Sequence, residues 1–383
     1  MRKGFLVFGS PLIEEAEIAE VVATLRSGWI GTGPRVQRFE EMFRRYIGAH
    51  HAVALNSCTA ALHLSMLVSG VGSGDEVITT PMTFCASANA ILHTGARPVF
   101  VDVERATGNI DPEQIEAAIT PRTKAILPVH YAGRPCRMDR IETIARRRGL
   151  QLIEDAAHAI EAEFHGRKIG TIGHLTCFSF YVTKNVITAE GGMVTSDHTA
   201  LCEKIRMYAL HGMSVDAWKR FADDGYRHYE VVLPGFKYNM TDLQAALGIH
   251  QLGRVAQGAA RRREIWARYD EAFEGLPLLR PAASEPNTTH ARHLYTVLLN
   301  TEGIRKTRDQ VLNELIGLNI GTGVHYRPLH LHRYYREAFG YRRGCFPNAE
   351  YIGDRTLSLP LSAKLTDADV SDVIAAVRAV CGA

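Results

Sequence analysis

The chain of 383 residues is 46% hydrophobic and 22% charged, an ordinary globular composition with the length for one large domain and a smaller one. Its formal net charge of +3 is too small to indicate a nucleic-acid partner or a membrane surface. Seven scattered cysteines without a C-x-x-C pair argue against disulfides and a metal centre. The apolar runs are too short for a signal peptide or for a membrane helix of ~20 residues, so we expect a cytoplasmic protein.

The predicted elements alternate between helices and short strands. Proline and acidic residues favour a first turn, so a helix is expected to begin near Ser10 and Pro11 and to end near Gly28. Apolar runs predict strands at 77–80, 98–102, 125–129, 150–153, 175–180 and 193–196, with helices at 59–68, 111–119 and 138–148. This alternation predicts an α/β fold whose large domain has a mostly parallel sheet covered by helices.

The last third of the chain has a different order of predicted helices and strands. One long helix is predicted over 241–273, followed by a strand at 296–299, a helix at 308–316, a strand at 320–325 and a final helix at 367–380. This pattern is typical of a smaller α+β domain. We place the boundary at residue 250, which gives domains 1–250 and 251–383, although no change in composition marks it.

Two residues indicate the chemistry. Asp155 ends an apolar run, which places it at the carboxyl end of a strand, where open α/β sheets bind ligands. Lys184 follows another strand and precedes the segment Glu190-Gly-Gly192. A lysine that attacks a carbonyl, with a carboxylate for a cofactor's ring nitrogen, is the arrangement of pyridoxal phosphate enzymes. Taken alone, Asp155 is better explained as a capping or salt-bridging carboxylate, and only the other residues of the pattern favour a ligand.

Further segments suit a phosphate and a flat ring. Small and hydroxyl residues, Thr59 among them, open a helix after a strand, where free backbone N–H groups attract an anion. Ser179 and Asn239 are placed to reach the same kind of group, and Phe84 is a candidate for stacking on a heteroaromatic ring. Each also has a structural explanation: a helix cap, a buried serine bonded to backbone, an amide ahead of a helix and a core aromatic.

Assembled in order, these segments resemble the DegT-type sugar aminotransferases of the fold-type I, aspartate aminotransferase-like, pyridoxal phosphate superfamily. The resemblance runs almost end to end, and many matches in one order are more specific than any single motif. The matching segments are 27–34, 57–62, 74–78, 101–102, 128–133, 153–159, 178–192, 235–246 and 357–360.

The resemblance implies roles around the cofactor ring. Lys184 binds the cofactor covalently and then moves the proton of the reaction, and Asp155 pairs with the pyridine nitrogen. His158, where many members have glutamine, contacts the ring's phenolic oxygen, and Phe84 stacks on the ring face. An intact lysine argues against the sugar dehydratases of the family, which carry histidine at the position of Lys184.

The resemblance also implies how the phosphate is held. Cys58 and Thr59, with Ser179, bind it from one chain. Cys58 replaces the usual glycine or alanine, which backbone donation tolerates. Asn239 is expected to reach the phosphate of the neighbouring subunit, which implies a homodimer with shared active sites.

Substrate contacts are expected at Trp29, Thr32, Tyr181, Glu161 and His325. Segments 28–33, 204–212 and 215–218 look closest to enzymes that aminate C4 of UDP-linked 4-keto sugars with glutamate as amino donor. Glu161 stands where the family usually has glycine, so it is the expected determinant of substrate choice. The alternatives are amination at C3 of a keto sugar, a keto-cyclitol substrate, and a non-catalytic protein that binds pyridoxal phosphate.

Overall fold

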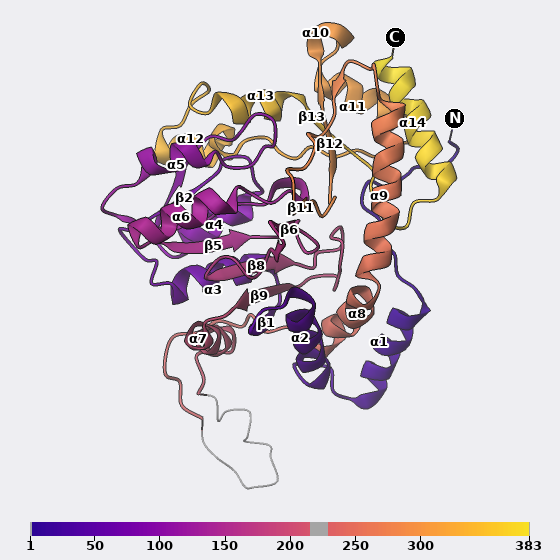
Figure 1. The fold of residues 1–383 in the computed structure, drawn as a ribbon. Helices are drawn as coiled ribbons and strands as arrows, with labels where there is room; N and C mark the ends of the chain where they lie inside the picture. Colours follow the sequence, from indigo (N-terminus) through magenta and orange to yellow (C-terminus); the bar gives the residue numbers. More distant parts are fainter. Residues whose placement is uncertain (1, 215–228, 383) are drawn as a thin grey trace.

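The computed structural model describes residues 2–214 and 229–382, so the segment 215–218 quoted above lies outside the described residues. A seven-stranded sheet in the order β1-β9-β8-β5-β4-β2-β3 forms its centre (Figure 1). The strands are β1 (His51–Leu55), β2 (Glu76–Thr79), β3 (Arg97–Phe100), β4 (Thr123–Ile126), β5 (Gln151–Asp155), β8 (Leu175–Ser179) and β9 (Gly192–Ser196). β9 runs antiparallel to both neighbours, and the remaining pairs are parallel, which confirms the predicted sheet.

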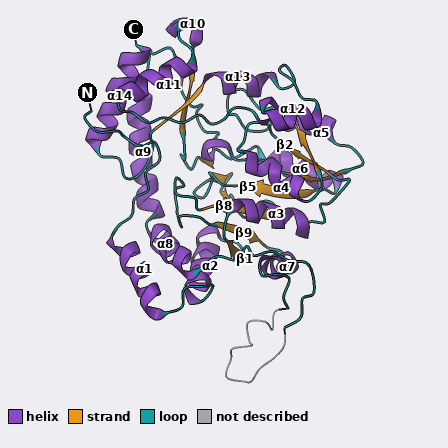
Figure 2. Ribbon diagram, turned by 180° about the vertical axis from the view of Figure 1, so that it is seen from behind, coloured by secondary structure: helices purple, strands orange, loops and turns teal. Residues whose placement is uncertain are grey.

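Helices cover both faces of this sheet (Figure 2). The side chains of Ile153 and Cys177 join one core with α3 (Cys58–Val68), α4 (Cys85–His93) and α7 (Thr199–Ala209). Their chain neighbours Leu152 and Phe178 join the opposite core with α2 (Pro34–Ile47), α5 (Pro112–Ala118), α6 (Met138–Arg148) and α8 (Asp242–Gly253). Successive strand residues point to opposite faces, so these continuous apolar runs are those of strands buried on both sides.

An aromatic cluster in the second of these cores supports the end of β8. The ring of Phe180, the residue after the strand, lies 5.1 Å from Phe39 and 5.4 Å from Phe43, measured between centroids. Both contacts are edge-on, a geometry that aromatic pairs favour. The loop that begins at Phe180 is therefore anchored to α2 before it reaches Lys184.

A separate hydrophobic core lies toward the C-terminus. It joins α9 (Val255–Ala272), α11 (Arg308–Gly317) and α14 (Asp367–Cys381) to the antiparallel strands β10 (Leu278–Leu279), β12 (Tyr295–Leu299) and β13 (Thr356–Leu359). Leu6 packs into this core although α1 (Glu15–Ser27) packs against α8. The domain boundary at residue 250 stays a prediction.

The remaining elements are α10 (Thr301–Ile304), α12 (Arg333–Phe339), α13 (Pro347–Arg355) and a small sheet of β6 (Glu163–Phe164), β7 (Arg167–Lys168) and β11 (Thr288–Thr289).

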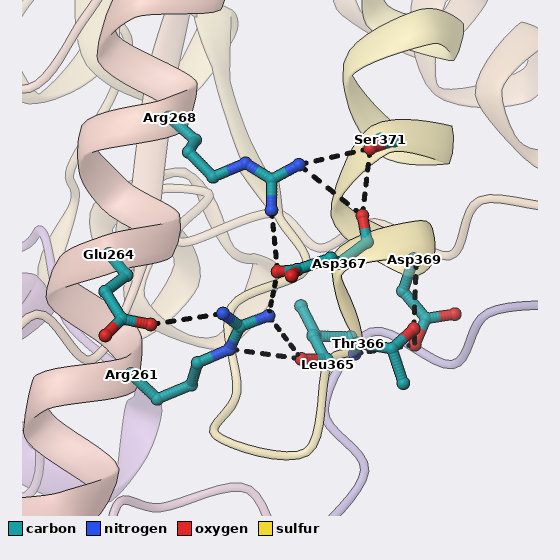
Figure 3. Close-up of polar contacts among 8 residues, drawn as sticks. All are labelled: Arg261, Glu264, Arg268, Leu365, Thr366, Asp367, Asp369 and Ser371. Atoms are coloured by element: carbon teal, nitrogen blue, oxygen red, sulfur yellow. Dashed lines mark hydrogen bonds and ion pairs between the residues drawn. The ribbon is translucent and has the colours of Figure 1, made fainter.

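Ion pairs fasten α9 to the start of α14 (Figure 3). The Asp367 carboxylate accepts hydrogen bonds from Arg261 Nη2 and Arg268 Nη1, each at 2.8 Å. Arg261 also donates to the backbone oxygen of Leu365 at 2.9 Å, and Thr366 caps α14. Two turns of the long helix are thereby attached to the last helix of the chain.

Three boundary predictions are wrong. The helix predicted over 241–273 is two helices, because Arg254 leaves helical geometry (φ −113°, ψ 15°) and its guanidinium donates to the backbone oxygen of Leu12 at 2.9 Å and to Glu17. The segment 320–325 forms only isolated bridges at Ile320 and Gly323, since its partners change from one residue to the next. The first helix begins at Glu15, because the Glu14 backbone is still extended.

Candidate active site

The sheet places the predicted lysine and carboxylate at one edge. Asp155 ends β5 and pairs in register with Cys177 of the parallel strand β8. Ser179 ends β8, and Lys184 follows in the loop that leads to β9. The carboxyl ends of neighbouring parallel strands lie together, so Asp155, Ser179 and Lys184 share the ligand-binding edge of the sheet.

The Asp155 carboxylate is buried and has no cationic partner within hydrogen-bonding distance among residues 2–214 and 229–382. Ser87 Oγ donates to Oδ2 at 2.7 Å, and the Ala157 N–H donates to Oδ1 at 3.1 Å. Burial raises the pKa of Asp155 even though Ser87 opposes the shift. A protonated pyridine nitrogen would supply the missing positive charge, so this carboxylate fits the expected cofactor.

Lys184 is prepared to act as a nucleophile. Burial lowers the pKa of its amine to about 8, while the charges of Cys58 and Asp155 work in the opposite direction. About half of the amines are therefore neutral at pH 8, and the neutral form is the one that attacks a carbonyl. The Cys58 thiol is a poor competitor, because burial and the nearby Asp155 raise its pKa well above the usual value.

The expected phosphate site lies at the start of α3. The Ser57 hydroxyl accepts a hydrogen bond from the Ala60 N–H at 3.1 Å, which caps the helix. The first helical N–H donor is that of Ala61, which bonds to the Ser57 oxygen at 3.1 Å. The N–H groups of Cys58 and Thr59 precede it and remain available to an anion. Gly192 connects this turn to β8, since it pairs with Leu55 on one side and Ser179 on the other.

Gly192 is required by close packing. A Cβ at this position would lie 2.4 Å from the carbonyl carbon and oxygen of Ser57. We expect Gly192→Ala to displace the start of α3 and to weaken cofactor binding by about 10-fold or more, since the helix terminus supplies the anion contacts. Cofactor titration followed by absorbance measures this. Gly72→Ala is the control, because a Cβ there meets nothing within 4 Å; equal affinities for the two variants would contradict the assignment.

His158 and Phe84 fit the contacts expected with a cofactor ring, one with an oxygen and one with the ring face. His158 is buried, with Nε2 3.2 Å from the Tyr326 hydroxyl, and its Nδ1 has no hydrogen-bond partner in the part of the chain that the structure covers. Such a buried polar atom fits a ligand oxygen. Phe84 precedes α4 with 60% of its surface exposed, and its ring centroid lies 6.3 Å from that of Tyr326. An exposed ring at this position fits stacking on a ligand.

Of the predicted substrate contacts, His325 lies close enough to Lys184 for their charges to interact. Its Nδ1 is 2.7 Å from Ser358 Oγ. Burial, and then the charge of Lys184, lower the pKa of His325 to about 4, so the ring is neutral near pH 7. Tyr181 lies three residues before Lys184 in the same loop and is 45% exposed. Neither residue lines the cavity beside Lys184 or the one at Phe84, so a contact of either with the substrate stays a prediction.

Three other predicted residues gather elsewhere. Trp29, Thr32 and Asn239 line a cavity of ≈470 Å³ whose lining residues do not include Lys184. The Asn239 amide donates to Thr32 Oγ1 at 2.6 Å, and Trp29 Nε1 donates to the Thr32 backbone oxygen at 3.0 Å. Within one chain, therefore, the structure does not bring these residues to Lys184.

Glu161 is buried with both carboxylate oxygens bonded within the protein. Oε1 accepts from Arg262 Nη2, and Oε2 accepts from Asn185 Nδ2 at 2.8 Å. The carboxylate contacts the neighbour of Lys184 and not open space, which differs from the substrate contact expected from the sequence.

Sequence reasoning missed several residues of this site: Ser87, Asn185, Arg262, His293 and Tyr326. Asn185 follows Lys184 directly, and Ser87 lies three residues after Phe84, so adjacency to the predicted residues is a usable signal for both. Arg262 lies in a basic run that is typical of a solvated helix face, yet it is buried. Tyr326 directly follows the predicted His325, so the same signal applies to it, whereas His293 belongs to a segment without a local motif.

The described part of the chain holds neither a metal cluster nor a membrane span. No group of three or more histidine, cysteine, aspartate or glutamate side chains within it is arranged to hold a metal ion. None of its helices combines the length and the apolar character needed to cross a membrane.

Comparison with known proteins gives matches over nearly the whole chain. The model of the DegT/DnrJ/EryC1/StrS aminotransferase family matches residues 11–378. The uncharacterized protein MJ1066 of Methanocaldococcus jannaschii is 53% identical over 99% of this chain and 98% of its own. The spore coat polysaccharide biosynthesis protein SpsC of Bacillus subtilis is 51% identical over 98% of this chain and 97% of its own.

Solved structures match equally far along the chain. The putative sugar aminotransferase Spr1654 of Streptococcus pneumoniae, in its PLP form, superposes with a TM-score of 0.91 at 36% identity, covering 98% of both chains. The Helicobacter pylori aminotransferase PseC, involved in the biosynthesis of pseudoaminic acid, gives a TM-score of 0.91 at 28% identity, covering 99% of this chain and 100% of its own.

Proposed function

The chain belongs to the DegT/DnrJ/EryC1/StrS aminotransferase family and is a pyridoxal phosphate-dependent sugar aminotransferase, and from this premise we propose that it aminates C4 of a nucleotide-linked keto sugar, with UDP as the nucleotide and glutamate as amino donor. The relatives named for polysaccharide and pseudoaminic acid biosynthesis support an amino sugar as the product. The intact Lys184 favours amino transfer over the removal of a hydroxyl group.

The observation that carries the nucleotide is a cavity beside the cofactor residues. It has a volume of ≈690 Å³ and begins at Phe84 and Tyr326. Tyr334 and Tyr335 contribute aromatic surface suited to a base, and Arg327 contributes a guanidinium suited to a diphosphate. A sugar held between the two would lie next to the ring site defined by His158.

The chemistry divides between the cofactor and the chain. Pyridoxal phosphate, when bound, supplies an electron sink. Lys184 Nζ takes the proton from the substrate carbon that bears nitrogen and later returns it. Asp155 would hold positive charge at the ring nitrogen, because its buried carboxylate has no cation within hydrogen-bonding distance among the described residues. His325, neutral near pH 7, would offer Nε2 to the sugar, since the ring's hydrogen bond within the described residues is made by Nδ1.

A homodimer with shared sites follows from the same assignment. Asn239 lies apart from Lys184 in its own chain, with Trp29 and Thr32 lining the same cavity. We assign this cavity to the cofactor phosphate and sugar of the neighbouring subunit.

The absence of disulfides among the cysteines of the covered ranges supports the cytoplasm as the compartment.

Product analysis tests the acceptor. The enzyme is incubated with glutamate and a panel of UDP- and dTDP-linked 4-keto and 3-keto sugars and a keto-cyclitol, and each product is identified by mass spectrometry and NMR. A C4 amine from a UDP-linked sugar is the expected result. A C3 amine or an aminocyclitol would replace the proposed acceptor while leaving the aminotransferase assignment intact.

The variant Arg327→Ala tests whether the nucleotide binds in the cavity at Phe84. We expect the KM for the nucleotide sugar to rise about 10-fold or more while the half-reaction with glutamate is unchanged, because the guanidinium assigned to the diphosphate is lost. Its hydrogen bond to the Leu331 backbone oxygen at 3.1 Å is lost with it. Arg333→Ala is the control, since that exposed side chain pairs only with Glu337 among the covered residues. Equal KM values for the two variants would place the nucleotide elsewhere.

A further inference from the structure

A buried polar chain runs from the long helix α9 to the residues around Lys184. Arg262 of α9 donates to Glu161, and Glu161 accepts from Asn185, the residue after Lys184. The Asn185 Oδ1 atom lies 3.1 Å from His293 Nδ1. The His293 ring lies 4.4 Å from that of His158, between centroids. The geometry points to Glu161 as a positioning residue for the aminotransferase reaction, and not as a contact of the sugar.

Glu161 fixes the orientation of the Asn185 amide. Asn185 Nδ2 lies 2.8 Å from Glu161 Oε2 and 3.2 Å from the Ala291 backbone oxygen. A carboxylate and a backbone oxygen only accept hydrogen bonds. The nitrogen must therefore face these two acceptors, and the amide oxygen must face His293. This assignment follows from the hydrogen-bond network alone.

The orientation of Asn185 in turn selects the tautomer of His293. Burial, and then the charge of Lys184, hold the pKa of His293 well below its usual range, so the ring is neutral and carries one proton. Because Asn185 Oδ1 can only accept, that proton sits on Nδ1. The ring packed against His158 is thereby fixed in one orientation, as is the loop that carries Lys184.

The position of Glu161 explains why it does not meet substrate. A cavity of ≈270 Å³ beside Lys184 is lined by Asn185 and Arg262, and Glu161 does not contribute to that lining. The carboxylate sits behind both residues and holds them. The inference concerns the reaction common to the family and holds whichever sugar is the acceptor.

Glu161→Gln tests the inference, with Glu163→Gln as a matched control two residues along the chain. The introduced amide can no longer present two acceptors, so Asn185 and His293 lose their fixed orientation. We expect kcat to fall about 10- to 100-fold with the KM for the sugar changed less than about 3-fold, because a misplaced reacting group costs rate more than binding. We also expect a shifted midpoint when the absorption band of the lysine-bound cofactor is titrated with pH.

A second variant separates the proposed effect on catalysis from a folding defect. Glu161→Met combined with Arg262→Leu removes both partners of the buried pair and leaves no unpaired charge, a replacement that buried pairs tolerate. It should remain folded by thermal melting and reproduce the loss of kcat and the spectral shift. A Glu161→Gln enzyme equal to Glu163→Gln in kcat and spectral midpoint would overturn the inference. So would a variant whose KM for the sugar rises while kcat is kept, which would make Glu161 a substrate contact.

Discussion

Lys184→Ala is expected to reduce amino transfer by about 10⁴-fold or more, because one side chain supplies both the covalent attachment and the proton transfer. The variant should still bind pyridoxal phosphate through the Asp155 and α3 contacts, but without the absorption band of the lysine-bound cofactor. Turnover with glutamate and a keto sugar, together with the spectrum, measures both effects. In the wild-type apoenzyme, attachment of the cofactor should accelerate as pH rises through about 8, the pKa of Lys184.

Lys124→Ala is the control for this variant, because that side chain is exposed near the amino end of β4. It should match the wild-type enzyme in rate and spectrum. Retained turnover in Lys184→Ala would remove the residue from the mechanism, whatever the spectrum shows.

Asp155→Asn should have opposite effects on activity and on the stability of the apoprotein. The neutral amide cannot hold positive charge at the ring nitrogen, so we expect activity to fall about 10³-fold. Burial raises the pKa of Asp155 in the folded chain. Its contribution to stability is therefore full below the unfolded carboxyl pKa and is lost as pH rises through the folded pKa. At neutral pH the apoprotein variant should unfold at a higher denaturant concentration than the wild-type chain.

Urea unfolding of the two apoproteins at neutral pH and at pH about 4 measures the stability effect, and the difference should shrink at the lower pH. Asp139→Asn, at the start of α6, is the control for both assays. An inactive and destabilised Asp155→Asn apoprotein would show that the carboxylate is structural, as an ion pair or a cap would be.

Local patterns predicted the elements whose signal is local. Apolar runs predicted six of the seven strands of the central sheet, all but β1. The ends of two of these runs pointed to Asp155 and Lys184 as candidate site residues. Arg262 and His293 could not be predicted this way, because each reaches the site by a tertiary contact with a distant part of the chain. The break at Arg254 was missed for the same reason: a guanidinium bonded to Leu12 ends α8, while the helical pattern continues through it.

Glu161 shows the limit of reasoning from a single unusual residue. Its carboxylate was a reasonable candidate for substrate choice while its partners were unknown. The contact with Arg262 comes from a helix a hundred residues further along the chain, and no local pattern marks that arginine as buried. The positioning role proposed for it rests on the partners of both oxygens.

The turn between β8 and β9 has a consequence for assembly of the enzyme. Ser179 pairs with Gly192, and the Phe180 N–H donates to the Gly191 oxygen at 2.9 Å, so the segment 180–191 is a loop closed at its base by the sheet. The entropy lost on closing a chain segment grows only with the logarithm of its length, and this one is short. The nucleophile is thus held by neighbours in sequence, and the apoenzyme can present it in place before any cofactor arrives.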